Sequence, residues 1–243
     1  MSKRNSVDRI KSVDLRPASL LKTTVWWVRR TTRDMLGGND ILDVHSKEKM
    51  FGRKIHKIYK KTDEFTNDYF PGLTRLTPRS VAIRRLRDAI TDLDYTVVDK
   101  DENRPWGAFY RINSEEANRF IKEFFPGVDP INARLGNSSR EVSPKFLLVA
   151  PGQRLSWQYH ERRAELWRFL SNGAYHKSMS NSQGKRMKAT VDTIVQFAQG
   201  ERHRLCAYDD QNWTLVAEIW QHTDPHKPSS EADIIRLQDD YSR

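Results

Sequence analysis

Apolar positions change their spacing partway along this chain of 243 residues. Residues 19–35, 47–65 and 79–93 carry apolar side chains at the three- and four-residue spacing of amphipathic helices. The TTVWWV core of the first segment is β-branched and aromatic, so a strand is the alternative there. The first third of the chain is therefore predicted to be mainly helical.

From about residue 95 the apolar runs become short, and polar turns separate them. After a short strand at 95–98, the runs are 145–150, 155–159, 166–170, 173–179, 190–197, 202–207 and 213–220. Short strands at close spacing, with turn residues between them, are typical of a β-sandwich or a β-barrel. The second part of the chain is therefore predicted to be mainly β.

Turn and capping residues predict where several elements begin and end. Thr77 and Pro78 predict a helix start, with Thr77 as the N-cap and Pro78 in the first helical position. Residues 114–117 open a second helix, which Pro126-Gly127 ends. The Arg-Pro-Trp-Gly sequence at 104–107 predicts a turn, and the polar tail 229–241 predicts a loop followed by a helix.

The charge is distributed unevenly along the chain. Residues 1–90 hold 21 Lys and Arg against 10 Asp and Glu, whereas residues 91–243 hold 21 against 22. Such asymmetry predicts two modules, a basic helical one at 1–90 and a β domain at 91–243. A basic module is suited to nucleic acid, an anionic membrane face or an acidic protein partner. A well-solvated helical surface is an equal alternative.

The apolar runs and the cysteine content bear on the cellular compartment. No run of about 18 apolar residues occurs, so no membrane span is expected. The first residues lack the apolar core of a secretory signal. Cys206 is the single cysteine, so no disulfide within the chain is expected, and a reducing compartment is favoured. We therefore expect a cytoplasmic protein.

Four residues offer metal-ligand chemistry in the β domain. Gln158, His160 and Glu165 lie close together in the sequence, and His203 follows on another predicted strand. Because alternate residues of a strand share a face, Gln158 and His160 are expected to point together into a barrel. Imidazole, carboxylate and amide oxygen suit a divalent ion such as zinc, manganese or iron. The alternative is that both histidines are ordinary polar residues of a barrel mouth.

A series of motifs carries a resemblance to a known family. The motifs are residues 104–107 (RPWG), 151–156 (PGQRLS), 158–160 (QYH), 163–167 (RAELW), 200–204 (GERHR), 218–220 (EIW) and 233–243 (DIIRLQDDYSR). With these motifs in this order, residues 97–243 resemble the cupin-type (type II) mannose-6-phosphate isomerases. The same domain forms the C-terminal part of bifunctional mannose-1-phosphate guanylyltransferases. The stretch 114–140 is similar to a bacterial subgroup often labelled phosphoheptose isomerase.

The resemblance implies a fold and an activity. The fold is a cupin, a jelly-roll or double-stranded β-helix barrel, here preceded by the basic helical module. The activity is aldose–ketose isomerisation of mannose 6-phosphate or a related sugar phosphate, with a divalent metal as cofactor. Cupins commonly pair through barrel edges, so a homodimer is also implied.

The sequence departs from the family pattern at the expected ligand strand. Arg162 and Leu166 stand where the family usually has histidines. A guanidinium does not ligate a cation and repels one. Three outcomes follow: a Gln158, His160, Glu165 and His203 ligand set, weak metal binding, or a metal-free anion pocket. The residues for that anion pocket are Arg154, Arg162 and Arg163.

The candidate catalytic and substrate-binding residues follow from the same comparison. Glu165 is the first choice as metal ligand, and Glu161 or Glu218 is the candidate base. Arg163 matches the family arginine and is the leading candidate for recognising phosphate, with Arg236 and Arg243 as weaker ones. Pairing of the tail arginines with Asp239 and Asp240 is the structural alternative.

Two other functions remain open at this point. The protein could be a catalytically inactive cupin that binds a sugar phosphate or another anion. Its basic module at 1–90 would then bind nucleic acid or a protein partner. It could also be a structural subunit that serves as a folded partner surface.

Overall fold

The computed structural model describes residues 70 and 72–242, which belong to one compact unit of the chain, Phe51–Arg243. The helices expected at 19–35 and 47–65 lie outside the described residues, as does Arg243. The described elements are α3 (Arg79–Asp92), β1 (Val97–Asp101), β2 (Gly107–Ile112), η1 (Ser114–Glu116), α4 (Ala117–Phe124), η2 (Asn132–Arg134), β3 (Val142–Val149), β4 (Trp157–Tyr159), β5 (Arg163–Phe169), β6 (Gly173–Ser178), β7 (Met187–Ala189), β8 (Ile194–Phe197), β9 (Arg202–Ala207), β10 (Thr214–His222) and β11 (Ile235–Gln238).

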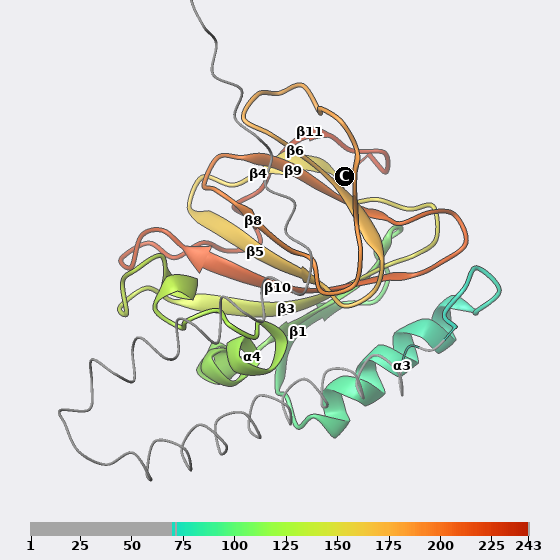
Figure 1. Ribbon diagram of the computed structural model, residues 1–243, viewed down its shortest axis with the longest axis horizontal. Coiled ribbons are helices and arrows are strands. Elements are labelled where there is room, and N and C mark those ends of the chain that lie inside the picture. Colours follow the sequence, from blue (N-terminus) through green and yellow to red (C-terminus); the bar gives the residue numbers. More distant parts are fainter. Residues whose placement is uncertain (1–69, 71, 243) are drawn as a thin grey trace, which may run out of the picture. The chain divides into compact units, whose positions relative to one another are not determined.

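Two antiparallel sheets form the body of this unit. The larger has the strand order β1-β2-β3-β10-β5-β8, and the smaller has the order β11-β4-β9-β6-β7. Figure 1 shows the smaller sheet above the larger one, with α3 and α4 on the outer side of the larger sheet. The mainly β, jelly-roll barrel of the cupin type predicted from the sequence is therefore confirmed.

Strand alternation divides the apolar side chains between two cores. On β3, Leu147 and Val149 enter the core between the sheets, whereas Phe146 and Leu148 face the helices. The Phe120 and Phe124 rings of α4 each lie 5.0 Å from the Phe146 ring. Because both faces of β3 are covered, the whole strand is buried, and its second half, residues 146–149, is continuously apolar.

Helix α3 completes the core on the outer side of the larger sheet. Its buried residues Ala82, Ile83, Leu86, Ala89 and Ile90 belong to the same cluster as the outward-facing side chains of β3 and β10. Helix α3 thus packs with the barrel although most of it lies before the boundary expected near residue 90. The division into modules at 1–90 and 91–243 stays a prediction.

The start of α3 differs from the sequence expectation. Pro78 is the N-cap residue and no side chain caps the helix. The Thr77 hydroxyl instead accepts a hydrogen bond from the Thr74 backbone N–H at 3.2 Å. The preference of threonine for the N-cap is therefore overridden here by a local turn.

Strand β2 was not expected, and it begins at the last residue of the Arg-Pro-Trp-Gly turn. Gly107 has φ of +151° and pairs with Val149 of β3. A Cβ atom at this position would lie 1.8 Å from the Leu148 carbonyl oxygen. Glycine is thus needed because the two backbones approach closely.

The tail forms a strand where the sequence predicted a helix. Residues Ile235–Gln238 are β11, which pairs antiparallel with β4 at the edge of the smaller sheet. The expected strand at 190–197 is also shorter, since only Ile194–Phe197 is extended. The expected helix at 114–125 is confirmed, with its first turn as η1. Among the described residues, no helix is both long and apolar enough to cross a membrane.

Candidate metal centre

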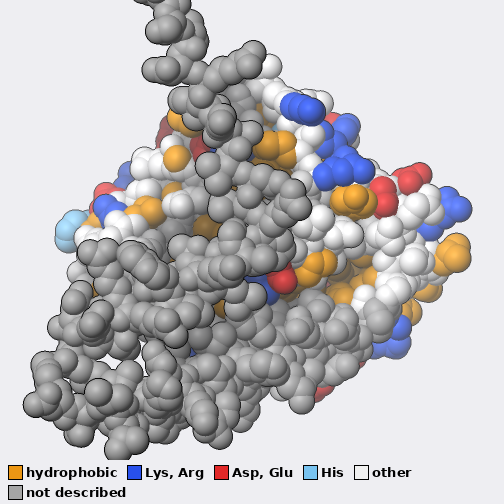
Figure 2. Space-filling view, in the orientation of Figure 1, with side chains coloured by type: hydrophobic (Ala, Val, Ile, Leu, Met, Phe, Trp, Pro, Cys, Tyr) orange, Lys and Arg blue, Asp and Glu red, His pale blue; other side chains and the backbone are white. Residues whose placement is uncertain are grey.

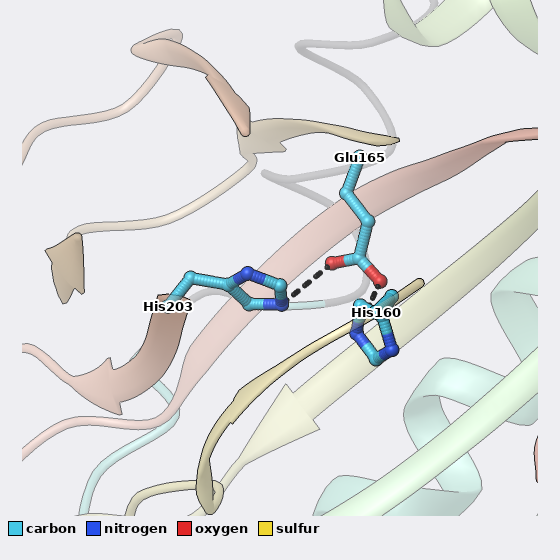
Figure 3. A group of neighbouring side chains, drawn as sticks. All are labelled: His160, Glu165 and His203. Carbon is cyan, nitrogen blue, oxygen red and sulfur yellow. Dashed lines mark ion pairs between the residues drawn. The ribbon is translucent and has the colours of Figure 1, made fainter. Parts of the chain in front are cut away.

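Three buried side chains from three segments converge inside the barrel. His160 follows β4, Glu165 lies on β5 and His203 lies on β9. Figure 3 shows the Glu165 carboxylate facing both imidazoles. Its Oε1 lies 3.1 Å from His160 Nε2, and its Oε2 lies 3.2 Å from His203 Nε2. The candidate ligand atoms all lie within 4.8 Å of one another, which fits a single metal ion.

Backbone carbonyls hold both imidazole rings. His160 Nδ1 lies 2.5 Å from the Asp233 carbonyl oxygen, and His203 Nδ1 lies 2.9 Å from that of Glu201. A carbonyl only accepts, so each Nδ1 carries a hydrogen, and Nε2 is then the nitrogen with a free lone pair whenever the ring is neutral. Metal-binding histidines are oriented by the same kind of contact.

The Nε2 atom of His203 gives a direct test of whether a metal fits. It is buried and has no hydrogen-bond partner among the residues that the structure describes. A buried polar atom without a partner is costly. A divalent ion between the two imidazoles and the carboxylate would satisfy this atom, so the residues present fit a metal.

The site favours a neutral His160 beside an ionised Glu165. Burial lowers the pKa of His160 to about 4. Burial alone would raise the pKa of Glu165, but its contacts with the surrounding side chains hold it well below its ordinary value. The Arg163 cation acts in the same direction, because Arg163 Nε donates to Glu165 Oε1 at 2.9 Å. Neutral imidazole and ionised carboxylate are the forms that bind metal.

Arg163 lies against the same ligand atoms. Its Nη2 is 3.2 Å from His160 Nε2, in addition to the Nε contact with Glu165. Its Nη1 donates to the Ser229 hydroxyl at 3.1 Å and the Ser230 carbonyl at 3.0 Å. The guanidinium also lies 3.6 Å from the centre of the Trp220 ring. Arg163 thus joins the metal-ligand cluster to the C-terminal segment 229–241.

Gln158 lies beside the cluster but presents the wrong atom. Its amide nitrogen is 3.5 Å from His160 Nε2, and its oxygen accepts from the Ser156 hydroxyl at 2.5 Å. A metal ion needs the oxygen. Gln158 therefore fits a fourth ligand position only with its amide turned over.

A second buried carboxyl, that of Glu218, lies next to Glu165. The Trp167 indole donates to Glu218 Oε1 at 2.8 Å, and the Trp220 indole donates to Oε2 at 3.0 Å. Trp167 also donates to Glu165 Oε2 at 3.1 Å. Burial, reinforced by the Glu165 charge, raises the pKa of Glu218 to about 8. The two carboxyls therefore have opposite pKa shifts.

A cavity of about 60 Å³ opens onto these groups. Its lining includes Gln158, Arg163, Glu165, Glu218 and Arg236. The structure therefore brings six of the predicted residues together at this site: Gln158, His160, Arg163, Glu165, His203 and Arg236.

The remaining predicted residues lie elsewhere. The Glu161 side chain is exposed and is not part of the cavity lining. Arg162 points to the C-terminal segment, with its Nε 3.9 Å from Asp233 Oδ1. Arg154 pairs with Asp240 at 2.5 Å and lines a different cavity. The three arginines of the expected anion pocket are thus not brought together.

Two further residues of the site were not expected from the sequence. Lys145 is buried between the Phe109 and Trp220 rings, 4.2 and 4.3 Å from their centres, and donates to Glu231 at 2.7 Å. Lys145 lies two residues before Leu147 on the same strand, and alternate residues of a strand share a face. This spacing is a signal that could have indicated an inward lysine. Asp233 contacts His160 across 73 residues, and no local pattern indicates that contact.

Comparisons with known proteins give only distant structural matches. No protein-family model matches the chain, and no curated protein matches it. Solved structures do match. A cupin 2 conserved barrel domain protein from Salinispora arenicola is 18% identical, with a TM-score of 0.29, over 34% of this chain and 64% of that one.

Two enzymes are among the other similar structures. The DMSP lyase of Ruegeria pomeroyi is 12% identical, with a TM-score of 0.30, over 38% of this chain and 44% of that one. The oxalate decarboxylase of Bacillus subtilis is 12% identical, with a TM-score of 0.37, over 60% of this chain and 30% of that one. The chain thus spans less than two thirds of the length of each of these three structures.

Proposed function

We propose that the barrel binds one divalent ion and isomerises a phosphorylated sugar, mannose 6-phosphate or a related one. The observation that supports the metal part is the convergence of two imidazole Nε2 atoms on one carboxylate, with both rings held by backbone carbonyls. Zinc, manganese and iron suit such a set. The isomerase part rests on the sequence resemblance and on the second carboxyl beside the cluster.

Glu218 is our choice for the base. It lines the same cavity as Glu165, and the Trp167 and Trp220 indoles fix both of its oxygens. Each oxygen keeps a second lone pair for a proton. Glu218 would take the proton from C2 of the aldose and return it to C1, while another proton moves from O2 to O1. A bound divalent ion would stabilise the negative charge that develops on the sugar oxygens.

Cations on the cavity wall would bind the phosphate. Lys145, Arg163 and Arg236 all line the cavity that holds Glu218. A volume of about 60 Å³ is small beside the roughly 300 Å³ or more of ordinary ligand pockets. The C-terminal segment 229–241, held by the Lys145–Glu231 and Arg163–Ser229 contacts, would therefore move to admit a sugar phosphate.

An inactive, anion-binding cupin is the second candidate, and one observation favours it. Arg163 donates to Glu165 Oε1 and lies 3.2 Å from His160 Nε2. A guanidinium in that position opposes a metal cation. In this alternative, the cavity binds an anion through Arg163 and its neighbours without turnover.

Three further expectations remain proposals. Residues 1–90 would bind nucleic acid or an acidic protein partner, and binding to nucleic acid would weaken steeply with salt. The single cysteine supports a cytoplasmic location. A homodimer is implied by the resemblance alone.

Turnover of mannose 6-phosphate by metal-loaded protein tests the isomerase proposal. We expect Glu218→Gln to lower kcat by about 100-fold or more, because a positioned base contributes that much. Glu141→Gln changes an exposed carboxylate and serves as the control. No turnover by the loaded wild-type protein would overturn the isomerase part. A loss in Glu161→Gln with full activity in Glu218→Gln would assign the base to Glu161.

A further inference from the structure

The outer face of the smaller sheet carries a second cavity, separate from the metal centre. It has a volume of about 240 Å³, and its lining includes Arg154, His176, Arg186, Cys206, Asp209 and Asp210. Strand alternation separates it from the barrel interior, because Cys206 of β9 points outward while His203 and Leu205 point inward. This cavity shares no lining residue with the one at the metal centre.

Basic side chains concentrate around this cavity. Arg154 and Arg186 line it, and Arg204 is buried on the same face of β9, two residues before Cys206. Asp240 is the carboxylate within ion-pair distance of both Arg154 and Arg204, at 2.5 and 3.8 Å. Figure 2 shows Lys and Arg side chains gathered at the edge of the molecule where the smaller sheet lies.

Two backbone carbonyls fix Arg186 at the cavity. Its Nη2 donates to the Ala207 and Tyr208 carbonyl oxygens, each at 2.7 Å. No carboxylate of the described residues lies within ion-pair distance of Arg186. A positioned guanidinium is suited to a phosphate oxygen.

Two carboxylates share the cavity with these arginines and do not pair with them. Asp209 accepts hydrogen bonds from the Gln211 and Asn212 backbone N–H groups, each at 2.9 Å, and these donors keep its pKa below the ordinary value although burial opposes them. Asp210 accepts from the Gln211 side chain. The cavity thus presents cationic donors and anionic acceptors that are held apart.

This combination selects the class of ligand. A bare anion would contact the arginines but also meet two carboxylates. A phosphorylated polyol matches both groups, because its phosphate accepts from guanidinium and its hydroxyls donate to carboxylate. We infer that this outer cavity is a second binding site for a small sugar phosphate, with Arg154 and Arg186 on the phosphate and Asp209 and Asp210 on the hydroxyls.

Calorimetric titration with three probes tests this site. The probes are mannose 6-phosphate, mannose and inorganic phosphate, added to the full-length protein. We expect the sugar phosphate to bind about tenfold or more tightly than either fragment, because each fragment leaves charged groups of the cavity unpaired. Equal binding of inorganic phosphate and the sugar phosphate would overturn the polyol part.

Variants assign the binding to this cavity. Arg186→Met should weaken binding of the sugar phosphate about tenfold or more. Lys185→Met, which removes a neighbouring exposed lysine, should not change it. His203→Ala should also leave this binding intact, so a failure of the proposed metal centre would not affect the result. No binding by the wild-type protein, or equal binding by Arg186→Met, would overturn the inference.

Discussion

Arg163 and Glu165 form a buried ion pair on the inner face of β5, with Arg163 Nε donating to Glu165 Oε1 at 2.9 Å. The carboxylate that a metal ion would bind is thus already paired with a cation of the protein. Buried pairs of this kind stabilise only when their geometry and other hydrogen bonds are good. Here Ser229, Ser230 and the Trp220 ring complete the surroundings of the guanidinium.

Removal of this cation should strengthen metal binding. Arg163→Met keeps an apolar chain against Trp220 but removes the charge and the donors beside Glu165 and His160. We expect the affinity for zinc to rise about tenfold, because a repelling guanidinium is lost. Competition with a chromophoric chelator measures this affinity.

Arg162→Met is the matched control for that prediction. Arg162 is half-exposed, and its charge lies beside Asp233, away from Glu165. Its substitution should change zinc affinity much less. Equal or weaker zinc binding by a folded Arg163→Met protein would contradict the competition between arginine and metal.

Gly107 should be irreplaceable at the junction of β2 and β3. Gly107→Ala places a Cβ atom 1.8 Å from the Leu148 carbonyl oxygen, and the backbone there has φ of +151°. We expect a loss of about 3 kcal/mol in the free energy of unfolding, as for strained overpacking. Urea denaturation measures it.

Gly127→Ala provides the comparison for Gly107→Ala. Gly127 also has a positive φ, of +85°, but a Cβ atom added there would meet no other atom within 4 Å. It therefore isolates the cost of backbone strain from that of the clash, and its loss of stability should be smaller. Equal losses for the two variants would contradict the close approach of β2 and β3.

His222 should make the protein less stable in acid. Its Nδ1 accepts from the Ser229 N–H at 2.8 Å and its Nε2 lies 2.9 Å from the Ser143 hydroxyl, so the ring is neutral. Burial, and then the Arg163 charge, lower its pKa from 6.5 to about 4, while Asp233 opposes them and the Arg111 and Arg162 charges add to them.

The sign of the pH effect follows from this lowered pKa. Between pH 6.5 and about 4 the unfolded chain binds a proton at His222 that the folded protein does not bind. The contribution of His222 to the free energy of unfolding is therefore fully present above pH 6.5. It is lost as the pH falls toward 4, by at most about 3 kcal/mol. The wild-type protein should lose more stability than His222→Gln between pH 7 and 4.5 in urea denaturation. Parallel losses would contradict this.

Local patterns were sufficient for most strands. The choice of His160, Glu165 and His203 also needed the family resemblance, because their spacing alone left the role of ordinary polar residues open. Local patterns were insufficient where contacts with residues far away in the sequence determine the structure of a segment. The sequence of β11 has no strong preference for either structure, and its pairing with β4 makes it a strand. Arg154 and Arg163 were both expected in one anion pocket, yet one lines a cavity on the outer face of the barrel and the other lines the cavity inside it. The carbonyl of Asp233 that holds His160 is likewise a long-range contact.

Metal content measured on the purified protein after incubation with zinc, manganese or iron and removal of the excess tests the central claim most directly. We predict about one ion per chain in the wild-type protein and in the Glu141→Gln control, and none in His160→Ala or His203→Ala. A folded wild-type protein without a bound ion, or full metal content in both histidine variants, would contradict a metal centre at His160, Glu165 and His203.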